Sequence, residues 1–287
     1  SNSLSPGNPN AGGNGRKAMM QAVDASLKRL KTDYIDLYLL HTWDRMTPAE
    51  EVMRTFDDLV RAGKIRYAGL SDVPGWYAAR AQTWAEAHPL TQPICLQLPY
   101  SLVERSIEHE FVPFAETLGL GITAWSPLAM GLLSGKCRPG ATEGGRLSQD
   151  TSGGGLGLFT ERNTRILTVL ERVADEMGRS MAQVALNWCV SRPGVAAAIV
   201  GASRLSQLDD NLAALEFEIP AEFRAELDRV TAIDAPYPYA LFADDYQAAI
   251  LNAGASVGDK PPNYRREILL PKVTDYAFGQ PKNKTLD

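Results

Sequence analysis

The sequence predicts an α/β fold built on a parallel sheet, and three observations support this prediction. Short apolar runs alternate with helical stretches at intervals of about 30 residues, which is the spacing of βα units. The apolar runs are nearly continuous, as expected for strands that are covered on both faces. Polar residues follow the carboxyl end of strand after strand, where α/β proteins assemble their sites.

The first half of the chain alternates regularly after a loop at residues 1–15, which is rich in Gly, Asn and Pro. Residues 16–30 carry Met, Val and Leu at helical spacing and predict an amphipathic helix. Thr-Pro-Ala-Glu at residues 47–50 is typical of a helix start. The expected strands are 34–40, 65–70, 94–98 and 121–125, and the further expected helices are 47–62, 76–87 and 107–118.

The second half begins with a Gly- and Ser-rich loop at residues 139–158, which is longer than a simple connection. Helices are expected at residues 160–177 and 180–191, and a buried strand at 195–200. Two further helical stretches, 205–215 and 220–231, close the regular part of the sequence.

Composition limits the function classes. The 287 residues are 45% hydrophobic and 22% charged, which suits a globular protein with a full core. A net charge of −5 gives no support for a nucleic-acid partner. Three scattered cysteines form no metal or disulfide pattern and fit a reducing compartment. No apolar run reaches the roughly 20 residues that span a bilayer, and no signal peptide is recognisable, so we expect a cytoplasmic protein without a membrane partner.

Residues 121–136 carry the clearest chemical signal. An apolar run reaches Trp125 and ends at Ser126-Pro127, because proline has no N–H for a central ladder. Gly131 then loosens the backbone and Lys136 adds a cation. Such a loop can hold a phosphate against backbone amides. An ordinary strand exit with one solvated lysine explains the same spacing equally well.

Two architectures place ligands at strand carboxyl ends, the (β/α)8 barrel and the open doubly wound sheet. No Gly-x-Gly-x-x-Gly follows a strand here, which argues against the second. The barrel requires eight strands, whereas five strand–helix units are found. Five strands would leave two open edges.

Five ordered motifs resemble the aldo-keto reductases, in particular the branch that includes the potassium-channel β-subunit-like reductases. The resemblance covers roughly residues 10–230, and its motifs lie at 27–41, 63–71, 97–105, 125–136 and 201–211. It implies a TIM barrel that carries NADPH across its top and reduces an aldehyde or ketone, with a Tyr proton donor and no metal.

The resemblance also implies a division of the chain. Residues 1–235 would hold strands 4 to 8 of the (β/α)8 barrel, which would be incomplete at its amino end. Residues 236–287 match no family pattern and would be a carboxyl-terminal extension, a substrate-side loop or a non-native tail.

The resemblance assigns roles at the reacting end of the cofactor. His41 is the counterpart of one member of the family's catalytic tetrad and would orient the substrate carbonyl. The tetrad's Asp, Tyr and Lys have no counterpart in this sequence. Ser71 and Gln97 would hold the nicotinamide carboxamide, and Tyr100 would stack on its ring. Asp72 departs from the pattern, because the family usually has Asn, and a carboxylate cannot donate a hydrogen bond.

The remaining assignments concern the phosphates. Small residues after the 121–125 strand would bring backbone amides to the pyrophosphate. Arg204 could pair with a 2′-phosphate in bidentate fashion, which favours NADP over NAD. The cofactor set expected from the resemblance comprises Ser71, Asp72, Gln97, Tyr100, Trp125, Ser126, Pro127, Leu128, Gly131, Leu132, Lys136, Gly201, Ser203, Arg204, Gln207, Asp210 and Asn211.

Taken singly, these residues have plainer explanations. A lone strand-end His is more often structural, Tyr100 would be a half-buried aromatic, and Arg204 a solvated residue on a capped helix. Trp43, Trp76 and Trp125 could line a substrate mouth or be ordinary aromatics. Two other classes stay open beside the reductase, a noncatalytic NADP(H)-binding regulatory subunit and an inactive fragment. The sequence identifies neither the carbonyl substrate nor the oligomeric state.

Overall fold

The computed structural model of the chain describes residues 12–135 and 156–251, together with positions 255, 258 and 261. Its centre is a five-stranded parallel sheet with the strand order β1-β2-β3-β4-β5. The α/β class and the parallel sheet predicted from the sequence are therefore confirmed. The strands are β1 (Ile35–Leu40), β2 (Ile65–Ser71), β3 (Pro93–Pro99), β4 (Gly121–Trp125) and β5 (Val195–Ala198).

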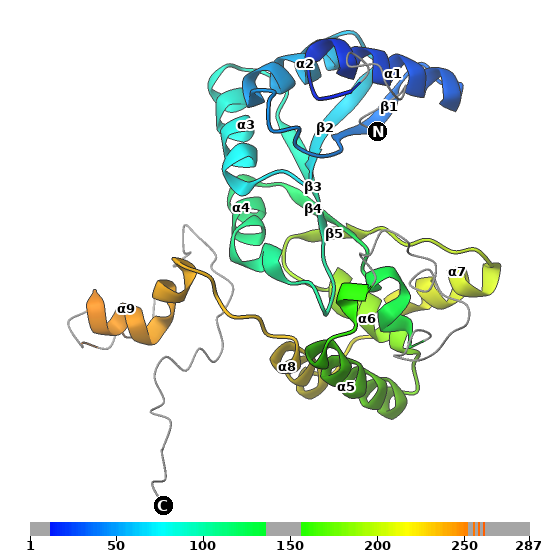
Figure 1. Ribbon diagram of the computed structural model, residues 1–287, viewed down its shortest axis with the longest axis vertical. Coiled ribbons are helices and arrows are strands. Elements are labelled where there is room, and N and C mark those ends of the chain that lie inside the picture. The colour runs from blue at the N-terminus through cyan, green and yellow to red at the C-terminus, as the bar shows by residue number, and fades with distance from the viewer. Residues whose placement is uncertain (1–11, 136–155, 252–254, 256–257, 259–260, 262–287) are drawn as a thin grey trace, which may run out of the picture.

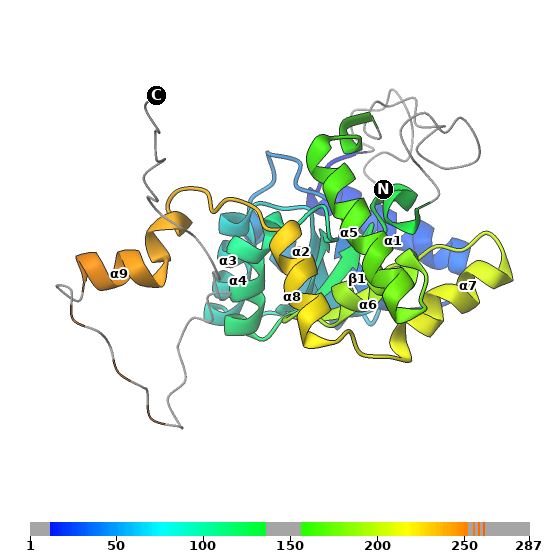
Figure 2. The ribbon, with the colours of Figure 1, turned by 90° about the horizontal axis from the view of Figure 1, so that it is seen from below.

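Helices connect the strands, so that the five carboxyl ends meet at one edge of the sheet. Figure 1 shows α2, α3 and α4 along one side of the sheet, and Figure 2 shows α5 beside α6 and α8. In both views α9 projects beyond the rest of the described chain. The α-helices are α1 (Arg16–Leu30), α2 (Ala49–Arg61), α3 (Gly75–Ala87), α4 (Phe111–Leu118), α5 (Glu161–Met177), α6 (Met181–Val190), α7 (Leu205–Leu212), α8 (Ala221–Val230) and α9 (Asp244–Ile250).

Short 3₁₀ segments fill several of the connections. They are η1 (Ser106–His109), η2 (Ala129–Ser134), η4 (Leu156–Leu158), η5 (Ala213–Leu215) and η6 (Tyr239–Phe242). No helix in the described ranges is both long and apolar enough to cross a membrane.

Capping residues fix where the helices begin and end. The side chain of Thr160 accepts from the amide of Asn163 at the start of α5. Ser180 forms a capping box with Gln183 at the start of α6, which satisfies two amides that no helical carbonyl can reach. Gly178 ends α5 in the left-handed conformation, where glycine has no Cβ to clash. These local signals explain why the two helices lie where the sequence predicts them.

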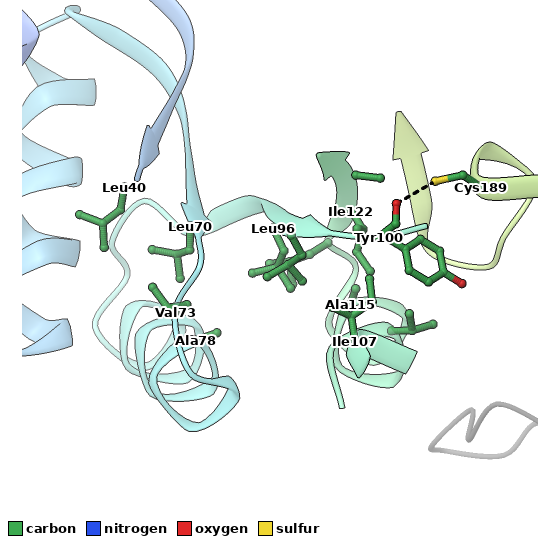
Figure 3. Close-up of a cluster of buried hydrophobic side chains, with 14 of the residues drawn as sticks. Leu40, Leu70, Val73, Ala78, Leu96, Tyr100, Ile107, Ala115, Ile122 and Cys189 are labelled. Carbon is green, nitrogen blue, oxygen red and sulfur yellow. Dashed lines mark hydrogen bonds between the residues drawn. The ribbon is translucent and has the colours of Figure 1, made fainter. Parts of the chain in front are cut away.

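A row of apolar side chains joins the sheet to its helices. Leu40, Leu70, Leu96 and Ile122 occupy matching positions on four neighbouring strands, and each is at most 4% exposed. Side chains from α3, η1, α4 and the loop before α3 pack against this row, as Figure 3 shows. Burying one such side chain contributes about 1.5–3 kcal/mol. This layer is the main core of the described chain.

The other face of the sheet is only partly covered. Tyr67 points to the side opposite Leu70, because the two are three positions apart on one strand, and it is 55% exposed. Gln97, on the same side as Tyr67, is half-buried. The expectation that the strands are covered on both faces is therefore wrong for the described chain.

Three predicted elements differ in extent. The helix expected at 107–118 is divided into η1 and α4, because Pro113 has no N–H to donate to the preceding turn and suits only the start of a helix. The strand expected at 195–200 ends at Ala198. Ile199 still donates its amide to Ala124, but the neighbouring strand then turns away at Ser126, whose φ is +55°.

The helix expected at 205–215 continues as α7 only to Leu212 and then tightens into η5. Four leucines on α7 and η5 are exposed, by 38% to 79%, and α7 buries no residue. They recur at intervals of three and four residues and so share one side of the helix. They are Leu205, Leu208, Leu212 and Leu215.

Candidate functional site

Asp72 connects the ends of three strands at the carboxyl edge of the sheet. Its carbonyl oxygen accepts from the hydroxyl of Thr42 at 3.2 Å and from the amide of Trp43 at 3.4 Å, both just beyond β1. Its own amide donates to the carbonyl of Gln97 in β3 at 3.3 Å. The φ of Asp72 is +46°, a left-handed conformation in which Asp and Asn are enriched. The residue type is therefore suited to this turn.

The carboxylate of Asp72 adds a fourth strand to this junction. Its Oδ1 accepts from the indole Nε1 of Trp125, at the end of β4, at 3.1 Å. The hydroxyl of Ser71 lies 3.3 Å from Oδ2 and donates over 2.9 Å to the carbonyl of Gln97. The ring of Trp125 remains 37% exposed. Asp72 thus holds an accessible aromatic ring at the edge where the strands end.

His41 follows β1 directly and is exposed. In the described part of the chain its imidazole makes no hydrogen bond, so both ring nitrogens are accessible to a ligand. The position is thus compatible with the predicted contact to a substrate carbonyl, which itself stays a prediction.

The turn after His41 is built around Asp44. Its carboxylate accepts from the amide and hydroxyl of Thr47, at 2.8 and 2.6 Å, and from the amides of Met46 and Asn14, at 3.0 and 2.8 Å. Burial raises the pKa of Asp44, but these hydrogen bonds outweigh burial and lower the pKa to about 2. The carboxylate is therefore ionised and fixes the chain that leaves the site.

Asn14 is a structural member of the site that the sequence analysis did not identify. It is 2% exposed, and its side-chain amide donates to the carbonyl of Thr42 at 2.8 Å. Asp44 followed by Thr47 at the start of a helix is a recognisable turn signal. Nothing in the sequence places Asn14, which belongs to the expected loop at residues 1–15, against this turn.

An aromatic cluster borders the same edge. The ring of Trp43 lies 5.4 Å from that of Trp76 in an edge-to-face arrangement and 6.0 Å from that of Tyr77. Trp76 is 60% exposed, whereas Tyr77 is buried. The predicted substrate mouth therefore has an accessible aromatic surface in Trp76.

Tyr100 lies inside the protein. It is 1% exposed, and its hydroxyl donates to Oε1 of Glu108 at 2.6 Å. Burial, together with the neighbouring Glu108 carboxylate, raises the pKa of the phenol. Figure 3 shows the ring at the end of the apolar cluster, with the carbonyl of Tyr100 accepting from the thiol of Cys189. The predicted stacking of this ring on a nicotinamide stays a prediction, and Trp125 is the exposed ring nearby.

Tyr100 belongs to a buried network that we call the Arg105 network, formed by Tyr100, Arg105, Glu108, Trp188, Arg192, Asp228 and Thr231. The guanidinium of Arg105 binds both carboxylate oxygens of Glu108 at 2.8 Å. Arg192 and the indole of Trp188 both donate to Asp228, at 2.9 and 2.8 Å. Each buried charge therefore has an opposite charge beside it.

The Arg105 network joins η1, α6 and α8. The guanidiniums of Arg105 and Arg192 lie 5.3 and 4.8 Å from the ring of Trp188, and Arg105 also donates to Thr231 at 2.6 Å. Sequence reasoning missed this cluster, because Arg105 and Thr231 are 126 positions apart. Only Arg105 and Glu108, three positions apart, form an ion pair that is local in the sequence.

The loop after β4 turns repeatedly through the left-handed region. Ser126, Ala129 and Met130 have φ of +55°, +47° and +57°, and Gly131 has +100°. The hydroxyl of Ser126 accepts from the amide of Met130 at 3.3 Å. A Cβ on Gly131 would contact no described residue within 4 Å, so the described part of the chain leaves space there for a ligand.

Of the other predicted pyrophosphate residues, Pro127 and Leu132 are buried and anchor the loop, and Leu128 is half-buried. Lys136 lies outside the described residues. The role of this loop in binding phosphate stays a prediction.

The segment before α7 has a defined structure. The side-chain oxygen of Gln207 accepts from the amide and hydroxyl of Ser203, at 2.9 and 3.0 Å. Arg204 is exposed and forms no ion pair with any described residue. Its guanidinium therefore remains available for an anion, and Gly201, just upstream, is exposed as well.

Asp210 and Asn211 lie further along α7. The carboxylate of Asp210 accepts from Ser180 at 3.1 Å and from Gln183 at 2.9 Å, which attaches α7 to the start of α6. Asn211 is half-buried. Asp210 thus has a structural role that the sequence analysis did not foresee, beside its predicted cofactor contact.

Comparison with known proteins identifies relatives of this chain, and the matched residues include all five strands of the sheet. The sequence profile of the aldo/keto reductase family matches residues 6–232. An uncharacterized oxidoreductase of Bacillus subtilis is 37% identical over 208 residues, which are 72% of this chain and 62% of that protein. The aryl-alcohol dehydrogenase [NADP(+)] of Phanerodontia chrysosporium is 31% identical over 256 residues, 87% of this chain and 66% of the dehydrogenase.

A Schizosaccharomyces pombe protein named for the β subunit of voltage-gated potassium channels is 34% identical over 228 residues, 77% of this chain and 66% of that protein. The matched part of this chain thus spans about three fifths to two thirds of the length of these relatives.

Proposed function

Because this chain belongs to the aldo/keto reductase family, we propose that it binds NADP(H) along the carboxyl edge of its sheet and serves the reduction of an aldehyde or ketone to an alcohol. The observation that carries the proposal is the junction at Asp72, which holds the exposed Trp125 ring beside Gln97 and beside the exit of β1. Family membership also supports a (β/α)8 barrel, in which β1 to β5 would be the fourth to eighth strands.

The residues at this edge fit the cofactor chemically. Trp125 offers an accessible aromatic face, and the half-buried side-chain amide of Gln97 has the hydrogen-bonding groups that a carboxamide requires. Ser71 is 1% exposed, and its hydroxyl donates to the carbonyl of Gln97. The burial of Tyr100 favours Trp125 as the ring that orients the nicotinamide. When bound, NADPH would supply the hydride.

His41 completes the proposed reacting end. An exposed imidazole at the end of β1 can donate a hydrogen bond to a carbonyl oxygen without a permanent charge. The group that protonates the alkoxide, a Tyr in the resemblance, is not assigned to a residue of this chain.

Arg204 provides the test of cofactor choice. Its unpaired guanidinium suits a 2′-phosphate, so Arg204→Ala should weaken NADPH binding about tenfold and leave NADH binding unchanged. Titration with each nucleotide, followed by protein fluorescence, measures both affinities. Arg165→Ala, which removes an exposed arginine of α5, is the matched control.

If Arg204→Ala weakened the binding of NADPH and NADH equally, Arg204 would not be the residue that recognises the 2′-phosphate. Binding of neither nucleotide to the unaltered chain would overturn the proposed function itself.

A noncatalytic NADP(H)-binding regulatory subunit is the second candidate. The relative named for a potassium channel β subunit favours it. The discriminating measurement is NADPH oxidation in the presence of 4-nitrobenzaldehyde. Oxidation of NADPH would favour the reductase, whereas binding of NADPH without oxidation would favour the regulatory subunit.

A further inference from the structure

Asp72 introduces a negative charge at the edge of the sheet. Among the described residues its carboxylate has only neutral hydrogen-bond partners, the indole of Trp125 and the hydroxyl of Ser71. No described cation pairs with it, and the side chain is partly exposed. The charge is therefore not neutralised within this part of the protein.

We propose that Asp72 makes this site favour the oxidised, positively charged nicotinamide of NADP+ over the neutral nicotinamide of NADPH. The inference rests on the proposed function, because it requires the nicotinamide to lie on Trp125. It concerns a property that the fold alone does not determine, namely the relative affinity for the two redox forms.

The geometry of the Trp125–Asp72 pair supports the inference. The indole Nε1 lies 3.1 Å from Oδ1, so the carboxylate borders the ring on which a nicotinamide would stack. Stacked rings have centroids roughly 4.5–7 Å apart, which would bring a pyridinium charge within about 7 Å of the carboxylate. A hydrogen bond from the indole to an anion also makes the ring more electron-rich, and a cation is attracted to such a face.

The magnitude follows from Coulomb attraction at a partly exposed edge. Opposite unit charges about 6 Å apart attract enough to change a binding ratio roughly three- to tenfold at effective permittivities between about 80 and 40. For a two-electron couple, a tenfold change in this ratio corresponds to about 30 mV in the midpoint potential of the bound cofactor. Because Asp72 favours the binding of NADP+ over NADPH, it lowers the midpoint potential of the bound cofactor.

Other charged groups near this edge are the same in every variant compared. Asp44 is ionised and held by Asn14 and Thr47, so it adds negative charge beyond β1. His41 is exposed and unpaired within the described ranges. The effect of Asp72 is isolated by comparing variants that differ only at that position.

Asp72→Asn is the decisive variant. Asparagine has the same shape, is enriched at positive φ as aspartate is, and keeps an oxygen that can accept from the indole. An added contact to the carboxamide would strengthen the binding of both NADP+ and NADPH, because both forms contain that group. The ratio of the two dissociation constants therefore reports mainly the charge.

The experiment measures the dissociation constants of NADP+ and NADPH by calorimetry with the full chain. We expect Asp72→Asn to reduce the preference for NADP+ three- to tenfold and Asp33→Asn to leave the preference unchanged. Asp33 is an exposed carboxylate in the loop before β1, at the opposite edge of the sheet.

An unchanged ratio in Asp72→Asn, with both nucleotides bound, would overturn the inference and leave the proposed function in place. Failure of the unaltered chain to bind either nucleotide would overturn the proposed function and the inference with it. An equal change in Asp33→Asn would show that the overall charge of the protein, and not Asp72, sets the ratio.

Discussion

At the scale of single residues, the candidate site depends on two aspartates, Asp44 and Asp72, that hold neighbouring segments in place. Asp44 receives four hydrogen bonds and holds the turn between β1 and α2, next to His41. Asp72, between β2 and α3, accepts from Thr42 through its main-chain carbonyl and from the indole of Trp125 through its carboxylate. Both residues therefore position their neighbours in addition to any contact with a ligand.

The low pKa of Asp44 predicts a pH-dependent contribution to stability. A carboxylate whose pKa is about 2 in the folded protein and 3.8 when unfolded stabilises the fold above about pH 4 and loses this contribution as the pH falls toward 2. Asp44→Asn should therefore lower the free energy of unfolding by about 1 kcal/mol at pH 7, after allowance for solvent screening.

Urea unfolding at several pH values between 7 and 3 measures this contribution. The difference between Asp44→Asn and the unaltered protein should shrink below pH 4. A constant difference over the whole range would contradict the assignment to the carboxylate charge. Asp33→Asn should show no difference at any pH, because Asp33 has no comparable set of donors.

The positions of the chemically active residues follow from the sequence more readily than their contacts do. His41, Ser71, Asp72 and Gln97 all follow or end predicted strands, and the structure has each at the carboxyl edge. The bond from Trp125 to Asp72 spans 53 positions and has no local signal. Contacts of this kind depend on which strands become neighbours, which is decided by the whole sheet.

At the scale of elements, strand β2 is packed most closely at Gly69. A Cβ at this position would lie 2.5 Å from Cδ2 of Leu39 and 2.9 Å from the carbonyl oxygen of Cys95, on the two neighbouring strands. Leucine can shift, but the backbone of β3 cannot do so without changing the register. Glycine at position 69 is therefore required by the close approach of β2 to its neighbours β1 and β3.

Gly69→Ala should accordingly destabilise the protein by about 2 kcal/mol, because an overpacked core forces its neighbours from their preferred positions. Thermal or urea unfolding measures the change. Gly157→Ala is the control, because a Cβ there would contact no described residue within 4 Å. Equal stability of the two variants would show that β2 tolerates the added methyl group.

The limits of predicting elements from sequence have identifiable causes. Capped helices such as α5 and α6 begin within a residue of the expected positions, because the capping side chains are local. The strand at 195–200 is shorter than expected, because its pairing depends on where β4 turns away. The apolar run alone does not contain that information.

At the scale of the whole molecule, the sequence predicts the α/β class and strand positions but not the exposure of the sheet. Coverage of both faces was expected from continuous apolar runs, and Tyr67 shows that one face is partly open in the described chain. The pattern of apolar residues along a strand does not show whether a helix or solvent lies against each of its faces. Exposure depends on the complete set of packed elements.

The Arg105 network has a consequence for how the protein opens to solvent. It links η1, α6 and α8 through buried charges, so separating any one of these elements leaves an unpaired charge in the others. Amide hydrogens in the three elements should therefore exchange with deuterium through a common opening, despite their distance along the chain.

Hydrogen–deuterium exchange of Glu108→Gln tests this expectation. Protection should fall together in η1, α6 and α8, whereas Glu226→Gln, which affects the more exposed Arg172–Glu226 pair, should leave α6 unchanged. Loss of protection in η1 alone would show that the elements open independently. If they open together, six side chains around the ring of Trp188 join three elements into one cooperative unit, although Arg105 and Thr231 are 126 positions apart.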